Sequence, residues 1–335
     1  MTQEATGPVY APELEGGEWI QGDPVMIHGS RRPVLLDFWN YTCVNCLRTL
    51  PCVTEWHRKY AEHGLMVVGV HTPEFSFAKN PEHVRRAVAS LGIEYPVVLD
   101  ADLKIWQAYA NRYWPAKYFI DVTGKLRTHH TGEGGYAESE QALQALISEQ
   151  EGFTGPLPEL MEPVRPEDKT GTVCYRVTPE LYCGLARGNI WQHHEHRAGP
   201  TEPVHGPREA RAGNAALRGR LDSAGGERGA AVRGTWDEPD APRLHGGRLE
   251  SGAASAGHGR DGDAAGADRR RDGGRDCGRG RAGRVVSIDS PRMFSLIRND
   301  EVEQHTLTLS SVSDGLAAFA FTFTSCVAPP LETEA

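Results

Sequence analysis

The sequence lacks the features that mark a membrane-spanning or nucleic-acid-binding protein. No apolar run is long enough to cross a bilayer, and residues 1–19 have neither the basic start nor the apolar stretch of a secretion signal. The formal net charge is -9, so no overall positive field attracts nucleic acid. We therefore expect a cytoplasmic protein with no membrane span and no nucleic-acid partner.

Cysteine is scarce, and its distribution excludes a disulfide scaffold. The 335 residues include seven cysteines, of which only Cys43 and Cys46 form a close CxxC pair. A second CxxC, typical of zinc sites, is absent, and Leu47 stands where haem attachment needs His. We expect no metal and no cofactor; a zinc site completed by Cys52 and His57 is the alternative.

Residues 191–284 have no Ile, Phe, Tyr, Met or Lys. Their 20 glycines, 17 arginines and 16 alanines make up more than half of the segment. A segment with so few large apolar side chains cannot bury enough surface to offset the entropy lost on ordering. We therefore expect residues 189–284 to be a low-complexity, disordered segment.

Residues 1–153 have the pattern of an α/β domain. Apolar runs predict strands at residues 34–38, 65–70, 97–99, 118–121 and 126–130, and amphipathic patterns predict helices at residues 44–61, 81–91 and 141–147. The last two strands form a hairpin, with Gly124 in its turn. This order predicts a mixed central sheet flanked by helices.

The remainder of the chain predicts a second module. Residues 154–188 begin Pro-rich and suit a linker that leads into that module. Within residues 285–331, the alternation at 305–309 and the apolar run at 316–324 predict strands of a half-buried antiparallel sheet. We interpret them as β-strand remnants of a β-sandwich whose partner strands are missing.

Cys43 lies between the strand that ends at residue 38 and the helix that begins at Val44. At a helix N-terminus, backbone N–H groups and the helix dipole stabilise a thiolate, which is the nucleophile in disulfide exchange. Cys46 follows one helical turn later, so its sulfur can reach back and close a disulfide. We expect Cys43 to attack and Cys46 to resolve.

Residues 36–51, LDFWNYTCVNCLRTLP, resemble the active-site segment of TlpA-type, thioredoxin-like redoxins. Asp37 matches the buried acid of that family, and the resemblance implies that it helps to deprotonate the resolving thiol. Pro51 matches the proline inside the family's helix. Pro115, after Trp114, matches the family's cis-proline.

Four segments are similar to the redoxin domain of DipZ-type proteins, which occurs alone or fused to a membrane electron-transfer unit. They are residues 39–51, 70–75, 111–115 and 132–136. The resemblance covers about the first 150 residues and implies a thioredoxin fold. It assigns client binding to the loop at Pro115 and to four other residues: Trp39, Thr42, Glu74 and Trp114.

The expected function is that of an enzyme, a monomeric thiol–disulfide oxidoreductase that more readily reduces than oxidises protein disulfides. Its expected partners are protein thiols and disulfides and an unidentified electron donor. Relatives of the domain can be periplasmic or membrane-fused. Two alternatives stay open: a peroxide reductase similar to peroxiredoxins, which share the fold, and a binding module formed by the C-terminal strands, with a vestigial redox site.

Several residues near the pair have two interpretations. Cys52 is either a buried small apolar side chain or a regulatory third thiol. His71 and Glu74 follow a strand, where they either shape the client groove or cap a loop. Asp37 is either the buried acid or an exposed residue at a strand end.

The composition of residues 189–284 has a second explanation. Arg, Gly and Ala are what GC-rich codons yield when they are read out of frame. A one-base shift over residues 189–199 gives a peptide similar to the start of the β-sandwich that follows the redoxin domain in DipZ-type proteins, and residues 285–323 resemble its end. We interpret the segment as the product of two frameshifts, in the gene or in its record.

Sequencing the coding DNA across codons 185–290 tests this interpretation. We expect two compensating single-base changes that restore an apolar, strand-rich reading frame. An unbroken frame under purifying selection would contradict it.

Overall fold

A computed structural model of the chain describes residues 8–174 continuously, then residues 180–182, 290–291 and the C-terminal strands named below. The chain divides into two compact units, Met1–Asp168 and Lys169–Ala335, and each is described here by itself. Among the described residues, no helix has the length and apolar character that crossing a bilayer requires.

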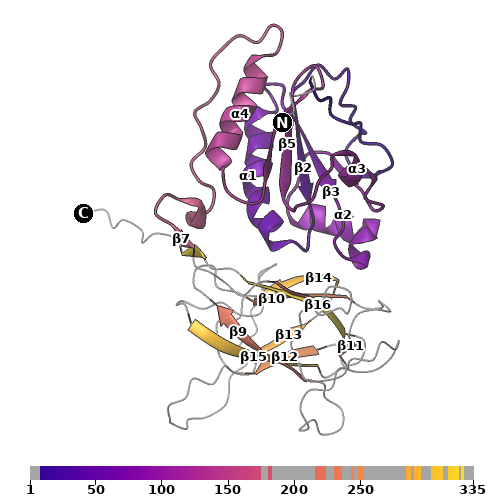
Figure 1. Cartoon of the computed structure of the whole chain (residues 1–335), viewed down its shortest axis with the longest axis vertical. Coiled ribbons are helices and arrows are strands. Elements are labelled where there is room, and N and C mark those ends of the chain that lie inside the picture. The colour runs from indigo at the N-terminus through magenta and orange to yellow at the C-terminus, as the bar shows by residue number, and fades with distance from the viewer. Residues whose placement is uncertain are drawn as a thin grey trace, which may run out of the picture. The chain divides into compact units, whose positions relative to one another are not determined.

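The first unit is built on one mixed sheet of six strands, in the order β1-β4-β3-β2-β5-β6 (Figure 1). Strands β2, β3 and β4 run parallel, whereas β1, β5 and β6 pair antiparallel with their neighbours. The strands are β1 (Glu18–Gln21), β2 (Val34–Trp39), β3 (Met66–His71), β4 (Val97–Leu99), β5 (Ala116–Ile120) and β6 (Leu126–Thr131). The mixed sheet predicted from the sequence is confirmed.

Four α-helices flank this sheet; α1 and α4 lie together on one side (Figure 1), and α3 packs on the other, where its Ile105 joins the apolar cluster of β2. They are α1 (Val44–Tyr60), α2 (Pro81–Ser90), α3 (Lys104–Ala108) and α4 (Tyr136–Ser148), together with the short 3-10 helices η1 (Ser76–Lys79) and η2 (Pro166–Asp168). This is the thioredoxin fold. The short β1 and α3 were not predicted from the sequence, because Glu18–Gln21 contains no apolar run and the five residues of α3 are too few to show a helical periodicity.

The central strand β2 is buried along its whole length. Val34, Leu36 and Phe38 join an apolar cluster on one face, with side chains from β3, β5 and α3. Because side chains alternate along a strand, Asp37 points to the opposite face, on which α1 lies. The fold therefore brings a carboxyl group beneath the helix that carries the CxxC pair.

The strap, residues 156–168, packs against α1 and α4 of the first unit. Gln144 Nε2 donates to Pro158 O at 2.7 Å, and the backbone N–H of Met161 donates to Glu140 Oε2 at 2.9 Å. Glu140 is itself buried and accepts a 2.6 Å hydrogen bond from the Tyr60 hydroxyl. The strap lies within the segment 154–188 that the sequence assigns to a linker, and it is part of the first unit.

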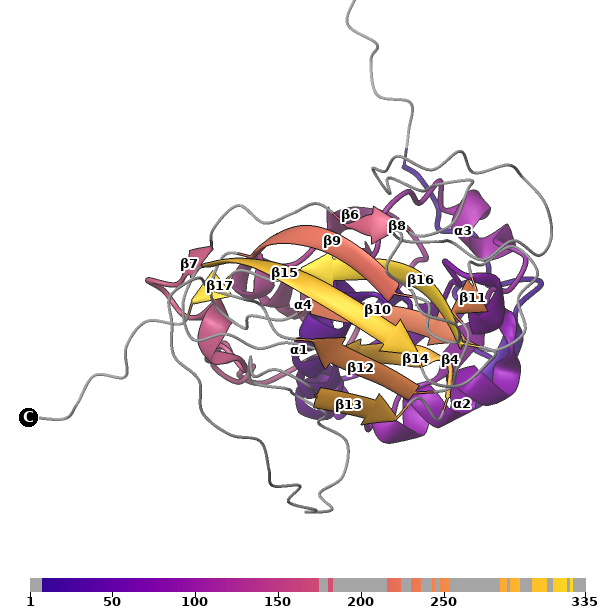
Figure 2. The same ribbon diagram turned by 90° about the horizontal axis from the view of Figure 1, so that it is seen from below.

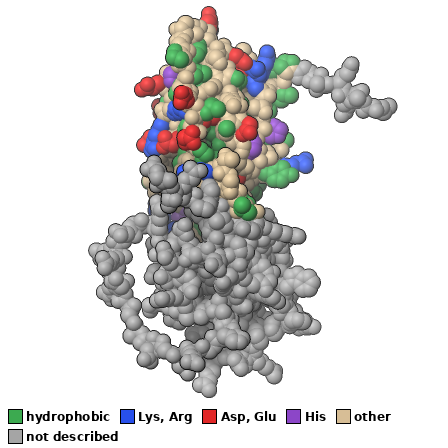
Figure 3. Space-filling model, turned by 90° about the vertical axis from the view of Figure 1, so that its left-hand side faces the viewer, with side chains coloured by type: hydrophobic (Ala, Val, Ile, Leu, Met, Phe, Trp, Pro, Cys, Tyr) green, Lys and Arg blue, Asp and Glu red, His purple; other side chains and the backbone are tan. Residues whose placement is uncertain are grey.

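On the face of the first unit drawn in Figure 3, acidic, basic and apolar side chains are interspersed.

The second unit contains two antiparallel sheets, drawn as separate layers in Figure 1 and seen from below in Figure 2. One has the order β11-β16-β10-β14, with β8 paired to β16, and the other has the order β13-β12-β15-β9; β7 and β17 form a separate pair. The strands are β7 (Val173–Cys174), β8 (Leu181–Tyr182), β9 (Ala216–Ser223), β10 (Ala230–Thr235), β11 (Arg243–Leu244), β12 (Arg248–Gly252), β13 (Arg284–Ser287), β14 (Arg292–Ser295), β15 (Glu303–Ser311), β16 (Leu316–Phe323) and β17 (Cys326–Val327).

Two expectations about the second unit change. The strands expected at 305–309 and 316–324 are confirmed as β15 and β16, but both have partners: β15 pairs with β9 and β12, and β16 pairs with β8, β10 and β11. Four of these partners lie within residues 189–284, where composition predicts disorder; the rest of that range lies outside the described residues. Strand pairing uses backbone N–H and C=O groups, and every residue except proline supplies both, whatever its side chain. The composition of this range therefore does not prevent its residues from pairing.

Candidate functional site

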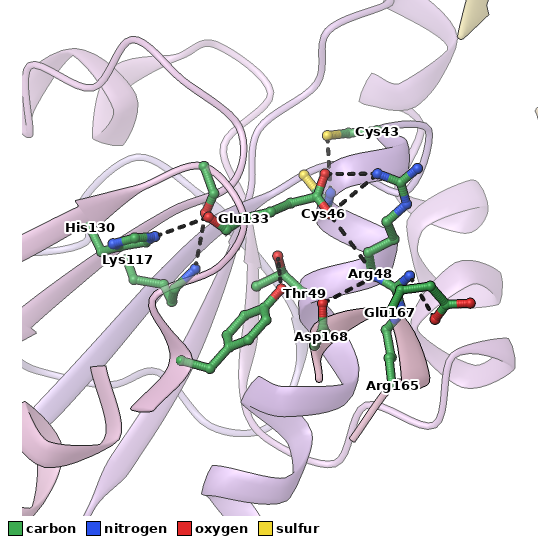
Figure 4. Close-up of polar contacts among 12 residues, drawn as sticks. Cys43, Cys46, Arg48, Thr49, Lys117, His130, Glu133, Arg165, Glu167 and Asp168 are labelled. Carbon is green, nitrogen blue, oxygen red and sulfur yellow. Dashed lines mark hydrogen bonds and ion pairs between the residues drawn. The ribbon is translucent and has the colours of Figure 1, made fainter. Parts of the chain in front are cut away.

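Cys43 and Cys46 lie together at the start of α1. Cys43 is the residue immediately before the helix, and its Sγ accepts a 3.3 Å hydrogen bond from the backbone N–H of Cys46 (Figure 4). Both thiols are free, and their exposed fractions are 7% for Cys43 and 1% for Cys46. The predicted position of Cys43 is confirmed. The helix start directs backbone donors at one sulfur, and Cys43 is the more accessible of the two.

A neutral histidine supports the turn between β2 and Cys43. The backbone N–H of Tyr41 donates to His71 Nε2 at 3.3 Å, and the two rings stack with their centroids 5.4 Å apart. Burial lowers the pKa of His71 to about 3, because the imidazolium would lose its hydration. His71 therefore stays neutral and can accept. Its complete burial matches loop capping, not a wall of the client groove.

Asp37 is buried, which confirms the first of its two interpretations. Burial raises the pKa of Asp37 to about 6, and the positive charge of Lys117 limits that rise. Its Oδ1 has no hydrogen-bond partner in the described part of the chain.

Cys46 is affected by the same surroundings. Burial raises the pKa of its thiol well above the ordinary value, and the hydrogen bond with Cys43 and the charges of Cys43 and Asp37 raise it further. Cys46 is therefore a thiol near neutrality. A carboxyl group that titrates near neutrality lies close enough to influence it.

Trp114 and Pro115 lie in the loop that precedes β5. Their peptide bond is cis, as the resemblance implies. The Trp114 indole donates from Nε1 to Thr72 O at 3.1 Å and packs on Trp106, with ring centroids 4.2 Å apart. These contacts fix the proline loop to the end of β3. Next to it, the Tyr113 side chain is 60% exposed.

The remaining residues assigned to client binding differ in exposure. Trp39 and Thr42 are completely buried, which favours a supporting role beneath the site over the client contact that the resemblance implies. Trp39 lies edge-on to His71, with 5.0 Å between ring centroids, so it helps to hold the turn. Glu74 is half-buried in the loop after β3 and keeps both of its interpretations.

Cys52 is a buried apolar side chain, as the first of its two interpretations holds. Its side chain is 1% exposed, and burial raises the pKa of its thiol to about 12. A thiol that stays protonated and inaccessible is a poor nucleophile. Within the described ranges, no three His, Cys, Asp or Glu side chains gather in a way that could hold a metal ion.

Four charged residues beside the pair were missed by the sequence analysis. Arg48 Nη1 forms an ion pair with Glu133 Oε1 at 2.9 Å, and Arg165 of the strap approaches Glu133 Oε2 at 4.0 Å (Figure 4). Lys117, in β5, is completely buried. The only signal in the sequence was the presence of a lysine in the otherwise apolar strand 116–120.

Comparison with known proteins agrees with this site. The family model described as AhpC/TSA matches residues 12–129. Protein DipZ of Mycobacterium tuberculosis is 39% identical over 182 residues, which are 53% of this chain and 26% of DipZ. Thiol-disulfide oxidoreductase YkuV of Bacillus subtilis is 32% identical over 143 residues, 42% of this chain and 95% of YkuV. A solution structure of an oxidized thioredoxin-like protein is 31% identical and covers 43% of this chain and 98% of its own, with a TM-score of 0.39.

The chain belongs to the thioredoxin-like thiol-disulfide oxidoreductases, since it covers almost the whole of YkuV at 32% identity. It spans about a quarter of the length of the DipZ proteins that it also matches. The residues matched by the AhpC/TSA family model, 12–129, include Cys43 and Cys46.

The pKa of Asp37 predicts an unusual dependence of stability on pH. In the folded state the pKa of this carboxyl group is about 6, and in the unfolded chain it returns to its ordinary value of 3.8. The folded state therefore binds the proton more tightly, and stability is lost as pH rises from about 4 to about 6. We expect Asp37→Asn to gain stability relative to the unaltered protein over this window, by on the order of 2 kcal/mol at pH 7.

Asp121→Asn is the matched control for this measurement by urea unfolding. Burial would raise the pKa of Asp121, but hydrogen bonds from Thr123, Lys125 and Arg127 outweigh burial and lower it. Its contribution is therefore present above the unfolded pKa and is lost as pH falls, so Asp121→Asn destabilises most at pH 7. A parallel pH dependence of the two variants would show that Asp37 is not the perturbed group.

Proposed function

We propose that this chain exchanges disulfides with client proteins through Cys43 and Cys46. The observation that carries the proposal is the contact between Cys43 Sγ and the N–H of Cys46 at the start of α1. This contact stabilises negative charge on the more accessible sulfur and keeps the second thiol within one helical turn. No other pair of thiols among the described residues has this arrangement.

The exchange has two steps. The Cys43 thiolate attacks a client disulfide, an S–S bond forms between Cys43 and one client sulfur, and the other client sulfur leaves as a thiolate. Cys46 then loses its proton and attacks Cys43, which closes the Cys43–Cys46 disulfide and releases the second client thiolate. The client gains two electrons and the pair loses two. Asp37 is the proposed acceptor for the Cys46 proton, since it is the carboxyl group that influences this thiol.

The reductase direction and the cellular location are further parts of the proposal. Reduction requires an electron donor that returns the pair to the dithiol state, and we propose another protein thiol in that role. The cytoplasm would supply such reducing conditions. One feature favours an oxidising compartment instead: Cys174 is disulfide-bonded, and strand register places it opposite Cys326.

Cysteine variants test the proposed exchange in an insulin-reduction assay with dithiothreitol as the donor. We expect Cys43→Ser to lose activity at least 100-fold, because the nucleophile is absent. Cys46→Ser should accumulate a mixed disulfide with the client on Cys43, visible by mass spectrometry. Cys52→Ala should keep activity within about twofold, since Cys52 is buried and its thiol is protonated.

The same proteins separate exchange from peroxide reduction, which the match to the AhpC/TSA family keeps as the second candidate. Hydrogen peroxide consumption should be slow compared with insulin reduction. Fast peroxide turnover that survives Cys46→Ser would favour the second candidate. A Cys43→Ser variant that still reduces insulin would overturn the proposed exchange.

A further inference from the structure

Lys117 lies beside Asp37 in the sheet. Strands β2 and β5 are antiparallel, and their register pairs Asp37 with Lys117 directly. Residues opposite each other in an antiparallel pair have side chains on the same face, with their Cβ atoms about 5 Å apart. The Lys117 side chain is 0% exposed, so the fold buries an amino group next to a buried carboxyl group.

Within the described part of the chain, the direct contacts of Lys117 include no hydrogen-bonded anion. Its Nζ donates a long hydrogen bond of 3.4 Å to Gly132 O and lies 6.0 Å from the centre of the Tyr136 ring (Figure 4). Neither partner is charged. An ammonium group buried in this way needs a nearby negative charge, or it loses its proton.

Two carboxyl groups influence Lys117, and they differ in their other partners. Glu133 pairs with Arg48 at 2.9 Å and is 4.0 Å from Arg165. Among the described residues, no arginine acts on the pKa of Asp37, and its Oδ1 lacks a hydrogen-bond partner. Burial lowers the pKa of Lys117, and the charge of Asp37 is the largest influence that opposes this change.

Other titratable groups face this pair from each packed element. They are Cys46 and Cys52 of α1, His130 of β6, Glu133 of the β6–α4 loop, Tyr136 of α4, and Tyr95, which precedes β4. None of them is a second cation. The positive charge that acts on Asp37 therefore comes from Lys117.

We propose that Lys117 is a positioning residue that keeps Asp37 ionised, so that Asp37 can take the proton of Cys46 in the second step of exchange. This inference rests on the proposed function. In this step the Cys46 thiol gives its proton to the Asp37 carboxylate. The resulting thiolate forms the S–S bond with Cys43, and the bond between Cys43 and the client sulfur breaks.

The physical reason is the cost of a buried carboxylate. Without a neighbouring cation, Asp37 would remain protonated at neutral pH and could not act as a base. Lys117 supplies that cation from within the sheet, where side-chain motion is restricted. Its hydrogen bond to Gly132 O also reaches the proline loop, because the Gly132 N–H donates to Pro115 O at 2.8 Å.

Lys117→Met tests the proposal in the otherwise complete chain. The reduced protein reacts with 5,5′-dithiobis(2-nitrobenzoate), which releases one thionitrobenzoate when Cys43 attacks and a second when Cys46 resolves. We expect the acid limb of the second phase to move up by about one pH unit in the variant, which corresponds to about fivefold slower release at pH 6. The first phase should stay within about twofold.

Lys125→Met is the matched control. It makes the same change in the β5–β6 turn, beyond Ile120 at the other end of β5, and should leave both phases unchanged. A purely structural role of Lys117 would lower the urea midpoint or slow both phases equally, with no movement of the acid limb. That result would overturn the proposal.

Asp37→Asn and the double variant Asp37→Asn/Lys117→Met keep the test decisive if Lys117→Met does not fold. With the carboxylate absent, further loss of Lys117 should not change the second phase by more than about twofold. A much larger additional loss would show that Lys117 does not act through Asp37. If the unaltered protein lacks a second phase, the proposed exchange itself fails, which is a different outcome.

Discussion

The turn from strand β2 into helix α1 places one sulfur against a backbone donor, and the chemistry of the site depends on that contact. Cys43 precedes the helix, so its Sγ accepts from the N–H of Cys46. His71 holds the turn from below through the N–H of Tyr41, and it can do so because burial keeps it neutral. The strand, the turn and the helix start form one unit, in which a shift of any part would move the sulfur.

Beneath this contact lies a second constraint, the charge on the face of the sheet that α1 covers. Asp37 and Lys117 occupy paired positions of β2 and β5, and both are buried. Each alone would tend towards its neutral form, whereas together they can retain opposite charges. The thiol of Cys46 lies in the same surroundings. The loss of its proton therefore depends on the register that pairs Asp37 of β2 with Lys117 of β5.

The sequence was sufficient to predict strand β2, the cysteine pair and helix α1, because a short apolar run followed by CxxC and an amphipathic segment is a local signal. It was not sufficient for Lys117, whose importance depends on antiparallel pairing between segments some 80 residues apart. It gave no sign of how the strap packs, since proline suggests a linker, whereas Pro158 O and the Met161 N–H contact Gln144 and Glu140 through backbone groups. Trp39 and Thr42 matched a family motif, but a motif gives no information on burial.

The most direct test of the account is a redox titration of the pair against defined ratios of reduced and oxidised dithiothreitol or glutathione, followed by alkylation and mass spectrometry of Cys43 and Cys46. The account predicts one two-electron transition that involves both cysteines, leaves Cys52 reduced, and lies near the thioredoxin value of about -270 mV. A potential close to about -120 mV would contradict the reductase direction. The absence of any disulfide between Cys43 and Cys46 would contradict the mechanism as a whole.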